Sequence, residues 1–336
     1  MINDRNSPCF FTIHEDENAY QVSYEITNLC NLKCKHCCNK STSTEYLGLS
    51  KDTVFLLIDE LKSINVNSIY LSGGEPTLYP HFSDVVHYIH KKNIDLALAT
   101  NAIEINEVLP ALTSFNETRE GVFISIDGIE NTHDKFRGKT GAFRKTINSI
   151  KVLLSNNVPV RVSTVIWKDN LNELEDLILF VKKIGVYKLH FSMLFNTGRA
   201  VDNNIGIPEE QYVTVCNTID RLAKKYSNNF FSISMRRNHP FSAGCDFCHG
   251  AEKILHINSK GYVFPCSWIA KTDLGKIFSF KWQSNNFKEN LKELHKFQDL
   301  VRKRIELYGY SGCPAVAYEK TKNMYGEDPL NKYLNE

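Results

Sequence analysis

Four of the ten cysteines in this 336-residue chain lie within nine residues, in the stretch C-N-L-K-C-K-H-C-C. Cys30, Cys34 and Cys37 have the spacing C-x3-C-x2-C, and Cys38 follows directly. Three thiolates from one short loop can bind three irons of a [4Fe–4S] cube, which leaves the fourth iron open for another ligand. A closed zinc site needs four ligands, and Cys38 or His36 could supply the fourth. The loop alone therefore leaves iron–sulfur and zinc as alternatives.

A second group of cysteines lies in the C-terminal third, with the spacing C-x2-C-x17-C-x46-C. Its members are Cys245, Cys248, Cys266 and Cys313. Four thiolates are a complete ligand set for an iron–sulfur cluster or for structural zinc, and the spacing does not separate the two. Cys216 instead lies in a helical pattern of apolar residues, which indicates a core cysteine.

The composition argues against several classes of protein. The chain is 42% hydrophobic and 23% charged, with a net charge of +2, so bulk charge does not indicate binding to nucleic acid or to an anionic membrane. No apolar run approaches the roughly 18 to 20 residues that span a bilayer, and the N-terminus lacks the apolar core of a signal peptide. We therefore expect a cytoplasmic protein, whose clustered thiols bind metal or do redox chemistry rather than form disulfides.

Strand and helix patterns alternate from residue 20 to about residue 226. The predicted strands are Tyr20–Thr27, Ser68–Ser72, Asp95–Thr100, Gly121–Asp127, Val160–Val165 and Lys188–Leu194. The predicted helices are Lys51–Ile64, His81–Lys92, Glu107–Phe115, Gly141–Ser155, Leu171–Ile184 and Pro208–Tyr226. Six successive βα units predict an α/β fold with a parallel sheet, a partial (β/α)6 TIM-like barrel. Ligands of such sheets bind at the carboxyl ends of the strands.

The pattern changes after about residue 230. Met235–Cys248 is typical of a loop, and Ile254–Ile257 with Tyr262–Phe264 predicts a β-hairpin. We expect a smaller C-terminal α+β iron–sulfur module that carries the second cysteine group. The predicted boundaries are an N-terminal extension over 1–19, the barrel over 20–229 and the module over 230–336.

The second predicted strand runs into Gly73-Gly74-Glu75-Pro76. Two glycines at a strand end let the backbone approach a ligand closely, and a glutamate beside them can accept a hydrogen bond from an ammonium or hydroxyl group. A Gly-Gly turn alone is a weak signal of a binding site. It becomes a strong signal here because it follows the C-x3-C-x2-C loop by one βα unit.

This pair of motifs resembles the radical S-adenosylmethionine (SAM) superfamily. The resemblance implies that Cys30, Cys34 and Cys37 hold a SAM-binding [4Fe–4S] cluster and that Gly73, Gly74 and Glu75 receive the SAM amino group. It also implies that His36 stacks near the adenine, where the family usually has an aromatic residue. Further SAM contacts are expected at later strand ends, from Thr100, Asn101, Ser125, Asp127 and Arg199, whereas Arg137 and Arg199 could instead be surface ion-pair partners.

The runs G-Y-V-F-P-C and G-C-P-A-V-A-Y resemble the SPASM extension of peptide-modifying radical SAM enzymes. The full extension binds two auxiliary clusters. Here the positions of its further cysteines are occupied by Leu300, Lys303, Gly309 and Asn331, whereas Cys245, Cys248, Cys266 and Cys313 are all present. The resemblance therefore implies one auxiliary [4Fe–4S] cluster in a shortened, twitch-like module.

The resemblance implies an enzyme that uses a 5′-deoxyadenosyl radical to take hydrogen from a ribosomally made precursor peptide, for oxidative crosslinking through a C–C or thioether bond. A flavodoxin- or ferredoxin-type protein would supply electrons. Only about 20 residues precede the barrel, so leader binding is expected to need a separate protein or the enzyme's own surface.

Three alternatives stay open at this stage. The first is oxidation or decarboxylation of a small molecule such as an aminocyclitol or tetrapyrrole. The second is epimerisation, which would need a hydrogen donor such as Cys38. The third is a zinc-binding protein without enzymatic activity.

Overall fold

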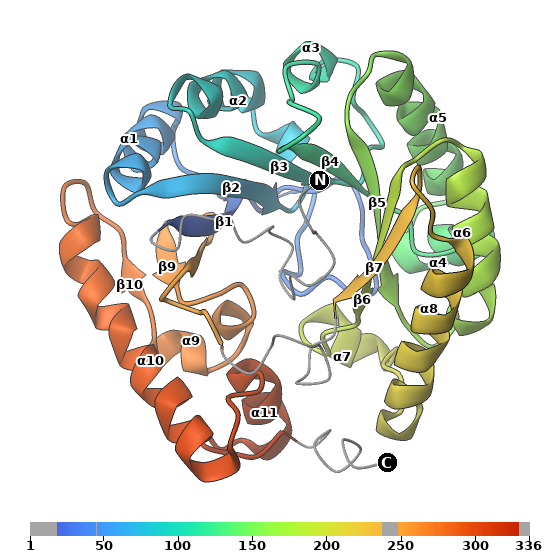
Figure 1. Cartoon of the computed structure of the whole chain (residues 1–336). Coiled ribbons are helices and arrows are strands. Elements are labelled where there is room, and N and C mark those ends of the chain that lie inside the picture. The colour runs from blue at the N-terminus through green and yellow to red at the C-terminus, as the bar shows by residue number, and fades with distance from the viewer. Residues whose placement is uncertain (1–18, 45, 237–247, 329–336) are drawn as a thin grey trace.

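The structure, a computed structural model, describes residues 19–44, 46–236 and 248–328. In this part of the chain ten strands form one sheet, in the order β10-β9-β8-β1-β2-β3-β4-β5-β6-β7. The strands from β8 through β1 to β7 are parallel, and β9 and β10 are antiparallel additions at one edge (Figure 1). The strands are β1 (Tyr20–Thr27), β2 (Val66–Gly73), β3 (Asp95–Thr100), β4 (Gly121–Ser125), β5 (Val160–Ile166), β6 (Lys188–Met193), β7 (Ser232–Arg236), β8 (Ile254–Ile257), β9 (Tyr262–Phe264) and β10 (Phe280–Lys281).

Helices cover the outer face of the curved sheet (Figure 1). The α-helices are α1 (Lys51–Ser63), α2 (Phe82–Lys91), α3 (Leu109–Leu112), α4 (Asn131–Arg137), α5 (Ala142–Ser155), α6 (Leu174–Lys183), α7 (Arg199–Asn203), α8 (Tyr212–Tyr226), α9 (Leu274–Ile277), α10 (Phe287–Tyr308) and α11 (Pro314–Thr321). Single 3₁₀ turns lie at η1 (Pro76–Leu78), η2 (Leu171–Glu173), η3 (Glu209–Gln211) and η4 (Ile269–Lys271). None of the helices in the described ranges is both long and apolar enough to cross a bilayer.

Local sequence explains why these elements form where they do. Helix α1 begins after Ser50, whose hydroxyl accepts a hydrogen bond from the Thr53 backbone N–H at 3.3 Å. Its buried residues repeat at helical spacing, namely Val54, Leu57, Ile58 and Leu61. In β1, alternate residues Val22, Tyr24 and Ile26 pack into the core beneath the helices, so Ser23 and Glu25 point to the opposite, inner face.

The predicted fold class is confirmed, with several corrections to individual elements. The sequence patterns predict six parallel strands, but β7 continues the sheet beyond β6, and β8 pairs in parallel with β1 at the other side. The prediction of a loop from residue 235 is therefore wrong for Met235 and Arg236, and 237–247 lie outside the described residues. The predicted helix at Glu107–Phe115 is only the short α3. The hairpin is confirmed as β8 and β9.

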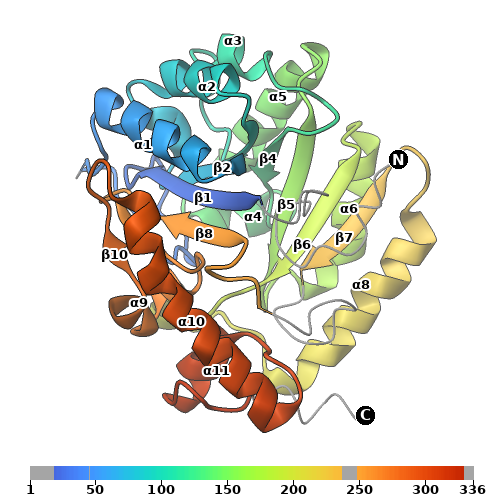
Figure 2. The same cartoon turned by 60° about the vertical axis from the view of Figure 1, so that its left-hand side comes forward.

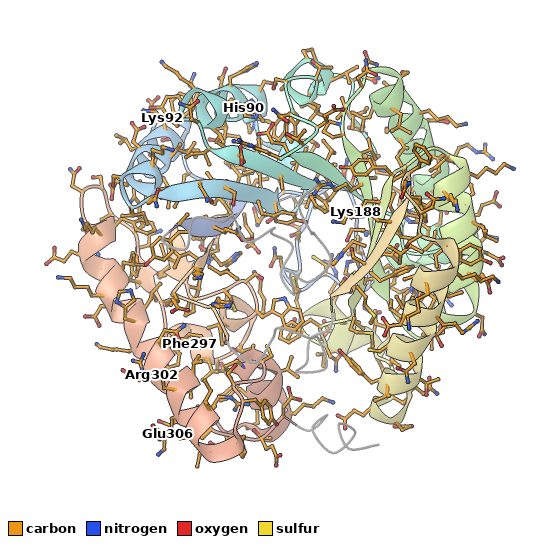
Figure 3. All side chains as sticks on the ribbon, in the orientation of Figure 1. His90, Lys92, Lys188, Phe297, Arg302 and Glu306 are labelled. Atoms are coloured by element: carbon orange, nitrogen blue, oxygen red, sulfur yellow. The ribbon has the colours of Figure 1, made fainter. Side chains whose placement is uncertain are left out.

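The C-terminal elements extend the barrel instead of standing apart from it. Helix α10 lies along the outside of this region and α11 beside its end (Figures 1 and 2). Phe297 of α10 is fully buried, whereas Arg302 and Glu306 point outward from the same helix (Figure 3). Because β8 joins β1 directly, the sheet runs through the predicted boundary at residue 230, and the division into domains remains a proposal.

Candidate functional site: the cysteine loop and its surroundings

The first three cysteines come together at the carboxyl end of β1. Cys30 and Cys34 are buried, and the half-buried Cys37 packs against the small apolar cluster that also holds Leu32 and Ile103. Burial raises the pKa of Cys30 to about 12 in the metal-free chain. Three soft sulfur donors in an apolar, largely water-excluded setting fit an iron–sulfur cluster, which takes its thiolates at separate irons.

Within the described ranges, no three His, Cys, Asp or Glu side chains are gathered around one point as a single metal ion would require. A zinc ion needs its sulfur ligands at about 2.3 Å, whereas a cube spreads them over its corners. The assignment of Cys30, Cys34 and Cys37 to a [4Fe–4S] cluster therefore remains a proposal.

Residues of α7 and α4 hold the backbone of this loop in place. Arg199, at the start of α7, donates from Nε to the Cys34 carbonyl oxygen at 2.8 Å and from Nη1 to the Ser41 carbonyl oxygen at 3.0 Å. Its backbone N–H donates to the Cys37 carbonyl oxygen at 3.1 Å. The backbone N–H of Lys35 donates to the carbonyl oxygen of Phe136 at 2.8 Å. The Arg199 side chain thus supports the loop, and a contact of Arg199 with SAM remains a prediction.

Two glycines let the loop pack closely on its neighbours. A Cβ on Gly198 would lie 2.6 Å from the carbonyl oxygens of both Cys37 and Cys38. A Cβ on Gly138 would lie 2.6 Å from the carbonyl oxygen of Lys33. Both glycines have positive φ, +57° and +69°, which side chains disfavour. The loop can therefore pack this closely on its neighbours only if both positions are glycine.

A buried ion pair lies behind the loop. Arg137 donates to Asp127 Oδ2 from Nη2 at 2.5 Å and from Nε at 2.6 Å, and its Nη1 lies 3.8 Å from Cys34 Sγ. Val165 donates its backbone N–H to the other oxygen of Asp127 at 2.8 Å. Arg137 is thus not a surface residue, and the Asp127 carboxylate joins α4 to β5. A contact of Asp127 with SAM remains a prediction.

His36 forms part of an aromatic stack. Its ring lies parallel to that of Phe136 at 4.3 Å between centroids, and Phe136 stacks in turn on Trp167 at 4.5 Å. Burial and the nearby charges of Arg137 and Arg199 hold the pKa of His36 well below its usual range, so the ring is neutral. A neutral ring fixed on Phe136 can stack, as expected, but the structure does not test its contact with adenine.

The G-G-E segment joins β2 to the cysteine loop and to β3. Gly74 is packed so closely that a Cβ would lie 2.3 Å from the Leu29 carbonyl oxygen. The buried carboxylate of Glu75 accepts hydrogen bonds from the Thr100 hydroxyl at 2.7 Å and from the Asn101 backbone N–H at 2.8 Å. It also accepts from the hydroxyl of Thr77 at 2.8 Å. Burial raises the pKa of Glu75, and these hydrogen bonds partly oppose that shift.

The remaining predicted SAM contacts lie at the same end of the sheet. Asn101 donates from its side chain to Asn31 Oδ1 at 2.8 Å, which ties the end of β3 to the cysteine loop. Ser125 is the last residue of β4 and is half-buried. Thus Glu75 and Asn101, at the ends of β2 and β3, contact the segment that carries the cysteines, and the roles of these residues and of Ser125 toward SAM remain proposals.

The second cysteine group is spread over three segments. Cys248 precedes β8, Cys266 follows β9 and Cys313 begins α11, and all three are half-buried against the main core. The backbone N–H of Ile269 approaches Cys266 Sγ at 3.4 Å. Cys245 and Asn331 lie outside the described residues, so the structure does not assemble the predicted four-thiol set.

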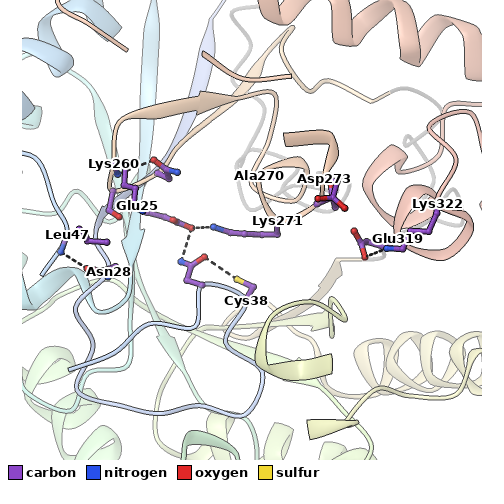
Figure 4. Close-up of a pocket in the computed structure, with 14 residues that line it drawn as sticks. Glu25, Asn28, Cys38, Leu47, Lys260, Ala270, Lys271, Asp273, Glu319 and Lys322 are labelled. Atoms are coloured by element: carbon purple, nitrogen blue, oxygen red, sulfur yellow. Dashed lines mark hydrogen bonds and ion pairs between the residues drawn. The ribbon is translucent and has the colours of Figure 1, made fainter. Parts of the chain in front are cut away.

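The sequence patterns missed three polar residues near the cysteine loop. Asn39 and Lys271 both contact Glu25 of β1, and all three line a cleft of about 540 Å³ between the cysteine loop and the C-terminal region (Figure 4). Strand alternation alone would have placed Glu25 on the inner face, where an acidic residue is a signal of function.

Known proteins resemble this chain in both sequence and fold. The sequence profile of the Radical SAM superfamily matches residues 24–181. An AdoMet-dependent heme synthase from Methanosarcina barkeri is 28% identical, over 93% of this chain and 96% of its own length. The sporulation killing factor maturation protein SkfB from Bacillus subtilis is also 28% identical, over 72% of this chain and 58% of its own.

Among solved structures, SuiB from Streptococcus suis bound to S-adenosylmethionine superposes with a TM-score of 0.72 at 14% identity, over 94% of this chain and 77% of that chain. SuiB has also been solved with its precursor peptide SuiA, with a TM-score of 0.67 at 15% identity, over 83% of this chain and 65% of that chain. At this identity the likeness shows the fold alone. Together with the enzymes among the sequence relatives, the profile match shows an enzyme with a radical SAM domain over residues 24–181, the segment that holds the cysteine triad and the G-G-E motif.

Proposed function

We propose that this enzyme removes hydrogen from a ribosomally made precursor peptide and makes an oxidative C–C or thioether crosslink. The observation that carries the proposal is the C-x3-C-x2-C loop seated beside the G-G-E end of β2 inside a domain that matches radical SAM enzymes. The maturation protein SkfB among its relatives supports a peptide substrate.

In this proposal, Cys30, Cys34 and Cys37 hold a [4Fe–4S] cluster with one iron left for SAM. When bound, the cluster and SAM supply the 5′-deoxyadenosyl radical that takes a hydrogen atom from the substrate. The chain's own part is positional: Arg199, Gly138 and Gly198 fix the loop. The apolar cluster around Cys30 limits the access of water.

We infer further that Cys245, Cys248, Cys266 and Cys313 hold one auxiliary [4Fe–4S] cluster, a group suited to one-electron transfer. A crosslink removes two hydrogen atoms in total from the peptide. The first would leave in 5′-deoxyadenosine, and the second would leave as a proton to solvent and an electron, for which such a cluster would be the acceptor. A flavodoxin- or ferredoxin-type protein in the cytoplasm would supply the reducing electron for SAM cleavage. Leader recognition would fall to a separate protein or to the surface of the enzyme.

A second candidate function is modification of a tetrapyrrole or another small molecule, by oxidation or decarboxylation. The observation that favours it is coverage: the M. barkeri heme synthase matches along 96% of its own length, whereas SkfB matches along 58%. Both candidate functions use the same site for the cluster and SAM, and they differ only in the substrate that binds.

The two candidates are separated by product analysis. The reconstituted enzyme, SAM and a reductant are incubated with precursor peptides or with tetrapyrrole carboxylates, and 5′-deoxyadenosine is quantified. A substrate-dependent increase with loss of two hydrogen atoms from a peptide supports crosslinking. Loss of carbon dioxide from a tetrapyrrole supports the second candidate. A peptide whose mass is unchanged in H₂O but that gains deuterium when the reaction is run in D₂O would indicate epimerisation, with Cys38 as the first hydrogen donor to test. If no substrate raises 5′-deoxyadenosine formation above background, both candidates fail.

A further inference from the structure

A partly buried chain of polar contacts connects the cysteine loop with the segment that follows Cys266. The side-chain amide of Asn39 donates to Glu25 Oε1 at 2.9 Å, and the Lys271 ammonium donates to the same oxygen at 2.8 Å (Figure 4). Asn39 lies two residues after Cys37, and Lys271 lies five residues after Cys266. One carboxylate oxygen therefore links the surroundings of the two cysteine groups.

The charges in this chain of contacts are well shielded from water. Glu25 is 9% exposed, and the side chain of Lys271 is 14% exposed. His256 Nε2 lies 3.5 Å from Glu25 Oε1, but burial lowers the pKa of His256 to about 4, so the ring is neutral at pH 7. The local charge is thus one ammonium against one carboxylate. Removing either residue leaves the other as an unbalanced buried charge.

Lys271 also lies within electrostatic reach of the cysteine loop. Burial lowers its pKa, but the Glu25 carboxylate raises it, and the Cys38 and Cys37 thiols add smaller upward contributions, so the net shift is upward. The ammonium is therefore charged in the folded protein. Cys38 and Lys271 line the same cleft, and charges interact more strongly in a protein interior, where the effective dielectric constant is below that of water.

A second contact holds the same segment in place. Trp268 stacks on Phe195 with 4.1 Å between ring centroids. Phe195 lies shortly before Gly198 and Arg199, which both pack against the cysteine loop. In η4, the Ile269 backbone N–H reaches back to Cys266 Sγ. The segment that carries Lys271 is thus held by contacts with residues near both cysteine groups.

We propose that Lys271 and Glu25 are positioning residues of opposite charge that set the reduction potential of the SAM-site cluster held by Cys30, Cys34 and Cys37. This inference rests on the proposed function, because it requires that cluster. Reduction adds negative charge, so a nearby buried ammonium favours the reduced state and a nearby buried carboxylate opposes it. Net charge and hydrogen bonding around the sulfurs are established ways in which a protein tunes such clusters.

The test is an EPR-monitored redox titration of the reconstituted full-length enzyme at pH 8, in which the signal altered by added SAM marks the SAM-site cluster. Lys271→Met should lower its midpoint potential, and Glu25→Gln should raise it. The double variant should return toward the parent value. Lys276→Met is the matched control, because Lys276 forms an exposed ion pair with Asp273 in the same region and should leave the potential unchanged.

A purely structural role for the pair predicts a different pattern, since both single variants break the same contact. Shifts in the same direction, or no shift with the SAM-site iron retained, would overturn the inference. If Lys271→Met loses its iron, Glu25→Gln decides alone: a raised potential supports the inference, and an unchanged or lowered one refutes it. A parent enzyme that holds no cluster at Cys30, Cys34 and Cys37 would instead refute the proposed function.

Discussion

The two cysteine groups are built in different ways. Cys30, Cys34 and Cys37 share one loop. Its backbone is held by Arg199 after β6 and by α4, and its Asn31 side chain is held by Asn101 after β3. Cys248, Cys266 and Cys313 come from three separate segments, and the Gln298 side chain of α10 donates to the Cys248 carbonyl oxygen. A site made from one loop depends on how the barrel supports that loop. A site made from separate segments depends on how those segments pack, and the following variants test this distinction.

The largest effect is expected from Arg137→Met. It leaves the fully buried Asp127 carboxylate without its cation, which should lower the free energy of unfolding by about 3–5 kcal/mol. Urea unfolding of the iron-free chain would measure the loss, and iron analysis should show the SAM-site cluster depleted. Lys135→Met is the control, because its ion pair with Asp169 is exposed and contributes about 0–1 kcal/mol. Equal losses for both variants would contradict the role of this buried pair.

The next largest effect is expected where Gly198 packs against the cysteine loop. Gly198→Ala brings a Cβ against the Cys37 and Cys38 carbonyl oxygens at positive φ, a strain of about 1–3 kcal/mol, and should reduce SAM-site iron. Gly206→Ala is the matched control, because no atom lies within 4 Å of its added Cβ. Mössbauer spectra of iron-57-reconstituted protein would compare the two variants. Full SAM-site occupancy in Gly198→Ala would show that the loop does not need this close packing.

The second region should respond to Gln298→Leu. The side-chain amide of Gln298 donates to the carbonyl oxygens of Cys248, at 3.2 Å, and of Gly250. Losing it removes one hydrogen-bond donor from both carbonyl oxygens, at a cost of about 1–3 kcal/mol, and should loosen the Cys248 segment. Iron and sulfide analysis should find auxiliary iron reduced and SAM cleavage retained. The exposed Gln283→Leu serves as control, and loss of SAM-site iron in Gln298→Leu would mean that the two regions are not independent.

The smallest effect is a dependence on pH. Burial lowers the pKa of His133 to about 3, and its Nδ1 accepts the Asp127 backbone N–H at 3.2 Å. The unfolded chain binds a proton below about pH 6.5, whereas the folded chain does not until about pH 3, so stability is full above pH 6.5 and falls as the pH drops toward 3. His133 should thus contribute about 1 kcal/mol to the loss of stability between pH 7 and 5.5. His133→Asn should have a flatter profile in denaturant unfolding, and an unchanged slope would refute the assignment.

Much of the fold and the first cysteine group could be predicted because the signals are local. The bounds of β1 and β3 agree with the strand patterns, and the three cysteines are neighbours in sequence. Strand β7 was missed, since its short S-I-S-M-R run is defined by pairing with β6 rather than by its own pattern. The Glu25–Lys271 contact joins residues 246 positions apart, which no local pattern reveals. Nor could the sequence show that the Arg199 guanidinium supports the cysteine loop.

The measurement that tests the central claim most directly is iron and acid-labile sulfide content after anaerobic reconstitution. It compares the parent with a variant in which Cys30, Cys34 and Cys37 are all alanine, and Cys216→Ala controls for the loss of a buried core thiol. We expect about eight irons in the parent and in Cys216→Ala, and about four in the triple variant, as two [4Fe–4S] clusters require. Zinc in place of iron, or equal iron in the parent and the triple variant, would contradict it.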